Sequence, residues 1–127
     1  MILFKRVFSL SILFFISLCN TGALGQCNNT SSYGSATAPT SGSVSISGCQ
    51  YQSEYSTIYS VVNGANYEVD NSAFGCATVT SGSPTGPVVD FGLVPLTWTA
   101  TSSGTYYIHW NTDCGSCGTA SPCSSTS

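Results

Sequence analysis

Basic side chains are almost absent from this chain of 127 residues, whose only lysine and arginine are Lys5 and Arg6. Everything after residue 6 carries five carboxylates and one histidine, His109. A surface without cations does not attract phosphate, nucleic acid or an anionic membrane. We therefore expect no nucleic-acid partner and no membrane insertion of the chain beyond its first segment.

Catalytic groups are also scarce. A Ser-His-Asp site could use only His109 as its base, and the sequence has no Gly-x-Ser-x-Gly turn. Glycoside hydrolysis needs two carboxylates in a cleft. Glu68 and Asp70 would share one face of a strand, but a small domain offers little room for a cleft. We therefore expect no catalytic residue and no cofactor.

The part of the chain after residue 26 has no apolar repeat of helical period. Its Thr, Val, Ile and Tyr residues, which strands prefer, form short runs between turn signals such as Asn63-Gly64. After an irregular lead-in at 28–42, these runs predict strands at 43–47, 55–62, 65–70, 75–80, 88–91, 96–101 and 106–111. Seven short strands predict an all-β domain at 26–127, a single antiparallel β-sandwich of jelly-roll or immunoglobulin-like type.

The last two predicted strands form a hairpin if a three-residue loop joins them, with Gly104 at the position that needs a left-handed residue. This register places one set of side chains in the core: Leu96, Trp98, Ala100, Tyr106, Ile108 and Trp110. It places another set on the outer face: Thr97, Thr99, Tyr107, His109 and Asn111. We therefore predict a flat ligand site centred on Tyr107, with His109, Thr97 and Thr99 beside it.

Residues 1–25 have the pattern of a secretory signal peptide. Lys5 and Arg6 precede an apolar stretch at 7–18, and Ala23-Leu24-Gly25 is a small-x-small cleavage pattern. The apolar stretch is shorter than the ~20 residues that a membrane-spanning helix needs. We therefore expect a protein that is secreted or displayed at the cell surface.

An even number of cysteines follows this predicted signal: Cys27, Cys49, Cys76, Cys114, Cys117 and Cys123. In an exported chain this pattern predicts disulfide bonds. Sequence spacing favours Cys117–Cys123 and Cys27–Cys49, which leaves Cys76–Cys114, but the other pairings stay open. His109 and the last three cysteines are also spaced like zinc ligands. We favour disulfides and no metal, because exported thiols usually oxidise first.

Three segments together resemble a known module: Cys49 to Ile58 (CQYQSEYSTI), Pro95 to Ala100 (PLTWTA) and Ser103 to Asn111 (SGTYYIHWN), with Cys117-Gly118-Thr119 and Cys123. They resemble a β-sandwich module near the N-terminus of secreted, adhesin-like Bacteroidetes proteins, which carry a C-terminal sorting domain for type IX secretion. The resemblance covers most of residues 26–123 and implies no catalytic residues and no particular ligand. Two interpretations of the end at Ser127 stay open, a fragment of such a protein or a stand-alone version of the module.

Together these observations predict a secreted, non-catalytic interaction or adhesion module that binds a glycan or a cell-surface protein. Two alternatives remain from other classes. One is a small exported hydrolase, or an accessory domain of one, and the other is a structural spacer.

Overall fold

The computed structural model describes residues 27–127, so the predicted signal peptide lies outside the described residues. This part of the chain is all-β, as the sequence predicts. Its strands are β1 (Ser31–Thr37), β2 (Ser47–Gln52), β3 (Glu54–Val61), β4 (Asn66–Val69), β5 (Cys76–Ser81), β6 (Val88–Leu93), β7 (Leu96–Thr99), β8 (Gly104–Asn111) and β9 (Ala120–Thr126). The described residues include no helix of the length and apolarity that crossing a membrane would require.

The largest sheet has five strands in the order β1-β3-β8-β5-β6. Its central strand, β8, runs antiparallel to both neighbours, β3 and β5. At one edge β1 runs parallel to β3, so the sheet is mixed rather than purely antiparallel. The predicted irregular lead-in at 28–42 is therefore wrong in its middle, because Ser31–Thr37 is a paired strand.

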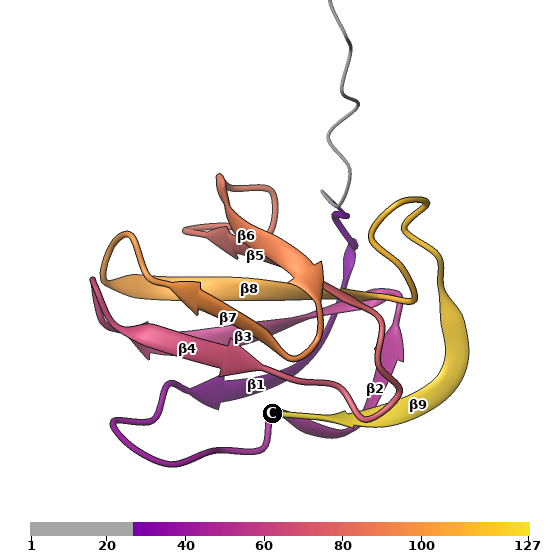
Figure 1. Ribbon diagram of the computed structural model, residues 1–127, viewed down its shortest axis with the longest axis horizontal. Helices are drawn as coiled ribbons and strands as arrows, with labels where there is room; N and C mark the ends of the chain where they lie inside the picture. The colour runs from indigo at the N-terminus through magenta and orange to yellow at the C-terminus, as the bar shows by residue number, and fades with distance from the viewer. Residues whose placement is uncertain (1–26) are drawn as a thin grey trace, which may run out of the picture.

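A two-stranded sheet of β4 and β7 lies in front of β3 and β8 (Figure 1). The core fills the space between them, where the indole ring of Trp98 on β7 is 5.0 Å from the ring of Tyr106 on β8. All six side chains predicted to face the core are buried. Burial of such a face is the main stabilising contribution in a domain of this size.

The predicted hairpin of β7 and β8 is nevertheless wrong. Strand β7 pairs with β4, and β8 pairs with β3 and β5, so the two strands belong to different sheets. The connection between them crosses from one sheet to the other. There the Tyr106 hydroxyl accepts hydrogen bonds from the backbone N–H groups of Thr101 and Ser102, at 3.1 and 3.0 Å. Tyr106 thus stabilises a connection between two sheets, where the sequence spacing predicted a tight turn within one hairpin.

A third pair of strands, β2 and β9, closes one end of the molecule (Figure 1). The predicted strand at 43–47 is wrong for most of its length, since β2 begins at Ser47. Strand β9 was not predicted. The chain just beyond β9 is bonded to the residue just beyond β4, because Asp70 and Ser127 exchange backbone hydrogen bonds of 2.9 and 3.2 Å.

The six cysteines within residues 27–127 all form disulfides, which confirms the prediction of oxidation. The pairs are Cys27–Cys117, Cys49–Cys123 and Cys76–Cys114. Only the third pairing matches the sequence prediction. Cys49 meets Cys123 because β2 pairs with β9, and Cys27 meets Cys117 because the start of the domain lies beside the 112–118 loop. The last three cysteines thus have three different partners, which contradicts a shared zinc site.

Candidate functional site

The structure does not bring the four predicted ligand contacts together. Thr97 and Thr99 lie exposed on β7, where Thr99 Oγ1 donates a 2.6 Å hydrogen bond to Asn66 Oδ1. Tyr107 and His109 lie on β8, on the face of the five-stranded sheet that points away from β7. The predicted patch fails because it depended on a β7–β8 hairpin.

His109 is fully buried rather than on an outer face. The chain around residues 27–30 covers it, and the backbone N–H of Asn29 donates a 2.8 Å hydrogen bond to His109 Nδ1. Burial lowers the pKa of His109, and the Pro84 carbonyl offsets only part of this effect. A neutral, covered imidazole is suited to holding the adjacent segment in place. Asn111, also predicted on this face, is buried by the same segment and the 117–118 backbone.

Tyr107 remains half-buried and accessible. Its ring stands edge-on to Tyr55 of β3, with 5.8 Å between centroids. Tyr59, two residues beyond the Thr57 position that pairs with Tyr107, is 48% exposed. This face therefore presents a small aromatic surface, without the threonines that were expected to accompany Tyr107.

A larger candidate site opens at the β4 edge of the molecule, where sequence reasoning placed none. It is a groove of about 660 Å³, which we call the β4 groove. Its walls are β4, part of β3 and the connection between β1 and β2, and its floor includes Ile58, Val69 and Trp98. Such a volume falls within the range of small-ligand sites.

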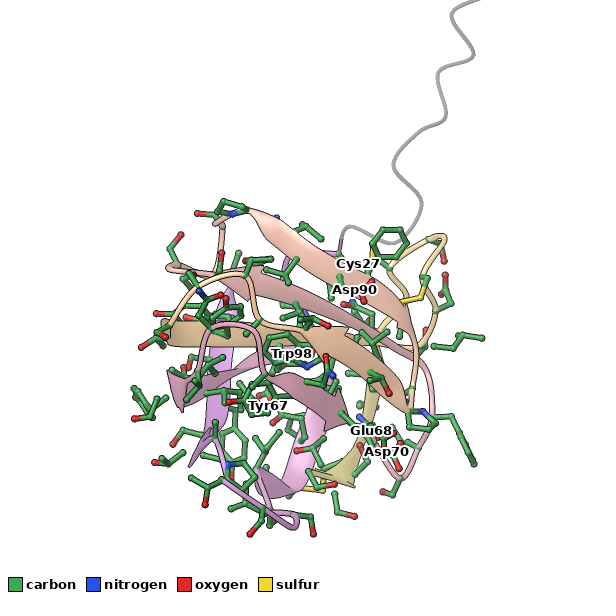
Figure 2. All side chains as sticks on the ribbon, turned by 60° about the vertical axis from the view of Figure 1, so that its left-hand side comes forward. Cys27, Tyr67, Glu68, Asp70, Asp90 and Trp98 are labelled. Atoms are coloured by element: carbon green, nitrogen blue, oxygen red, sulfur yellow. A yellow bond between two sulfur atoms is a disulfide. The ribbon has the colours of Figure 1, made fainter. Side chains whose placement is uncertain are left out.

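Two aromatic side chains that line the β4 groove stack on each other. The ring of Tyr67 lies beside that of Trp98 (Figure 2), with 5.2 Å between their centroids. Trp98 packs in turn on Tyr106. The Tyr67 hydroxyl oxygen accepts a hydrogen bond from the Val62 N–H, so its own proton is free to donate. The buried Trp98 Nε1 has no acceptor among the described residues. Buried donors of this kind are rare in folded proteins and call for an explanation.

The charges beside the β4 groove are all negative. Glu68 and Asp70 line it, and both are exposed. No lysine or arginine follows residue 6, so within residues 27–127 neither carboxylate has such a partner. The described residues contain no cluster of three or more His, Cys, Asp or Glu side chains suited to a metal ion. The groove therefore offers apolar and aromatic contact with an acidic rim.

The Asp113 loop, residues 113–118, concentrates polar groups but satisfies them internally. The Asp113 carboxylate accepts hydrogen bonds from the backbone N–H groups of Gly115, Ser116 and Gly118, at 2.6 to 3.2 Å. Led by the Ser116 N–H, these bonds lower the pKa of Asp113 to about 2. Because the carboxylate is already saturated with donors, this loop is better suited to holding its two cysteines in position than to binding a ligand.

In comparisons with known proteins, the chain matches no family model, no curated protein and no solved structure.

Proposed function

We propose that this chain is a secreted, non-catalytic interaction or adhesion module, a β-sandwich of jelly-roll or immunoglobulin-like type, that binds a glycan or a protein at the cell surface. The single observation that carries the proposal is the β4 groove, with Tyr67 stacked on Trp98 above an apolar floor. Aromatic side chains supply large, rigid contact area and a polar edge, which suits recognition of both sugars and proteins.

The arrangement of titratable groups favours binding over catalysis. Glu68 and Asp70 are the carboxylates that line the groove, and both are exposed. His109, the single histidine, is buried on the opposite side of the five-stranded sheet. General acid–base groups act within a site that excludes water, whereas the two carboxylates beside the groove face solvent and the histidine does not line it.

The disulfides support placing this module outside the cell. Three of them in a single small domain are typical of oxidising compartments. The signal-peptide pattern of residues 1–25 points the same way. The resemblance to modules of adhesin-like Bacteroidetes proteins remains a prediction and agrees with this placement.

Two tyrosine variants test whether the protein binds and locate the ligand. The oxidised protein would be screened on a glycan array and against extracted cell-surface proteins, with Tyr67→Ala and Tyr107→Ala alongside. We expect Tyr67→Ala to weaken the strongest interaction about tenfold, the loss of one good aromatic contact, while Tyr107→Ala leaves it unchanged. Loss only in Tyr107→Ala would move the site to the opposite face. No interaction with either set would favour the structural spacer.

A further inference from the structure

The free edge of β4 is the feature that defines what the β4 groove can hold. Among the strands of residues 27–127, β4 pairs only with β7, which lies on one side of it. In an antiparallel pair, residues that hydrogen-bond to the partner strand alternate with residues whose backbone groups point away from it. The Ala100 N–H donates a 2.9 Å hydrogen bond to the Ala65 carbonyl, so Ala65 is a hydrogen-bonded position. Tyr67 therefore bonds to β7, while the N–H and C=O groups of Asn66 and Glu68 point to the other side. Both of those residues line the groove.

Asp70 is the next residue whose backbone groups point away from β7, and it shows that this edge accepts backbone hydrogen bonds from another segment. Its N–H and C=O exchange hydrogen bonds with Ser127, which directly follows β9. On its other side β9 is held by the Ile46 N–H, which donates to the Thr126 carbonyl at 2.8 Å. The groove is lined by β4, by the segment that precedes Ile46 and by Ser127. In Figure 1 the arrow of β9 points toward the space between β4 and the connection from β1 to β2. An added strand there would extend the pairing that β9 begins.

We propose that the β4 groove binds an extended peptide segment of a partner protein, which pairs antiparallel with β4 along the line of β9. This inference rests on the proposed function, since it takes the groove as the binding site. Strand addition of this kind gains its affinity from main-chain hydrogen bonds and its specificity from alternate side chains. The free N–H and C=O groups of Asn66 and Glu68 match a peptide backbone in spacing and direction, which a sugar ring does not.

The side chains of β4 set the chemistry of the peptide. Tyr67 and Val69 face the core, so peptide residues opposite them point down onto Trp98 and should be apolar. Glu68 faces solvent, so the peptide residue opposite it lies beside a carboxylate. Because the acidic rim has no cation of its own, lysine or arginine is favoured there. The expected ligand alternates apolar and polar residues, with a basic residue facing Glu68.

A peptide library with two edge variants tests this proposal. A random library of linear peptides of about ten residues, long enough to span β4, is selected on the immobilised, oxidised protein. In Glu68→Pro the free N–H is replaced by a ring, while the bonds to β7 remain. Proline is tolerated on such edges, and Asn66→Pro repeats the test at the start of the strand. Thermal melts establish that each variant is folded.

We expect the enriched peptides to have alternating apolar residues. Either proline variant should bind them about tenfold more weakly, because the proline ring removes one main-chain hydrogen bond and keeps the peptide backbone from approaching β4 closely. Glu68→Gln keeps the backbone donor and removes the charge. It should retain the alternating peptides and lose the preference for lysine or arginine. This matched pair separates backbone pairing from electrostatic attraction.

Several outcomes would overturn the inference. The library could yield no enrichment, or peptides without alternation, or binding that folded Glu68→Pro and Asn66→Pro leave intact. If glycans bind and Tyr67→Ala weakens them while the library yields nothing, the proposed function stands and strand addition is wrong. If neither ligand class binds, both proposals fail.

Discussion

At the scale of single residues, His109 couples the stability of the fold to pH. Its buried imidazole accepts the Asn29 N–H at Nδ1, and protonation would remove this acceptor and bury a charge. Its pKa lies below the usual 6.5 in the folded protein. The unfolded chain therefore binds a proton more readily, so the stabilising contribution is complete above pH 6.5 and is lost as pH falls from there toward the folded pKa.

We therefore predict that the free energy of unfolding is constant above about pH 7 and falls as the pH drops below 6.5 toward the lower pKa that His109 has in the folded protein. Urea unfolding followed by tryptophan fluorescence at each pH measures it. His109→Gln is the matched control, because its amide does not titrate in this range and should flatten the profile. An equally steep profile in His109→Gln would show that another group is responsible.

We predict that substitution of Trp98 by alanine lowers the free energy of unfolding much more than substitution of Tyr107. Trp98 is 2% exposed and packs between Tyr67 and Tyr106, so Trp98→Ala should cost about 3–5 kcal/mol of stability. Tyr107 is half-buried with one edge-on aromatic contact, so Tyr107→Ala should cost about 1 kcal/mol. Chemical denaturation of both variants measures the difference. A larger loss for Tyr107→Ala would contradict the face assignment.

Alternation along the chain predicted which residues face the core, but not what covers the other face. Tyr106, Ile108 and Trp110 are buried as their spacing in the sequence implies. His109 has the same spacing as a solvated strand residue, yet it is buried because the backbone of Asn29, distant in sequence, lies over it. A pattern with a period of two residues identifies the two faces of a strand. It carries no information about a covering segment from elsewhere in the chain.

At the scale of elements, the strands rich in Val, Ile and Tyr were predictable and the serine-rich ones were not. Strands β3, β5 and β8 match their predictions to within a few residues. Strands β1 and β9 consist mostly of small polar residues, which are equally common in loops. Their strand conformation comes from pairing with β3 and β2, a tertiary effect that outweighs weak local preference.

The β4 groove could not be predicted for a related reason. Its lining residues come from β3, β4, β7 and the connection between β1 and β2, and Trp98 of β7 lies at its floor because β7 pairs with β4. Tyr67 and Trp98 were visible in the sequence as alternating apolar positions. Their stacking required knowing that they are cross-strand partners.

The attachment of β9 gives a prediction at this scale. Strand β9 pairs with β2 in an irregular register, and Cys49–Cys123 links the two strands covalently. The double variant Cys49→Ser/Cys123→Ser should lose about 2–5 kcal/mol of stability, as is typical for a native disulfide in a small exported domain. Hydrogen exchange should rise first in β9 and at Asp70, its partner beyond β4. Exchange that rises uniformly over the five-stranded sheet would contradict this local attachment.

At the scale of the whole molecule, each of the three disulfides links the last part of the chain to an earlier part. Their sequence separations are 90, 74 and 38 residues, and each has one cysteine between residues 114 and 123. Cross-links that close long loops restrict the unfolded chain most strongly, by about 2–4 kcal/mol each. The last part of the chain is therefore covalently linked to the start of the domain, to β2 and to β5.

These magnitudes predict that the folded domain depends on oxidation. Small domains have about 5–15 kcal/mol of total stability, and three disulfides together contribute a comparable amount. Full reduction should therefore unfold the protein near room temperature, as seen by loss of tryptophan fluorescence anisotropy and near-ultraviolet circular dichroism.

A chelator should have no effect, because Cys114, Cys117 and Cys123 are bonded to other cysteines rather than to a metal. Thiol alkylation of the exported protein followed by mass spectrometry should label none of the six cysteines after residue 26. Two or more labelled cysteines, or unfolding by the chelator alone, would contradict this dependence and restore the zinc alternative.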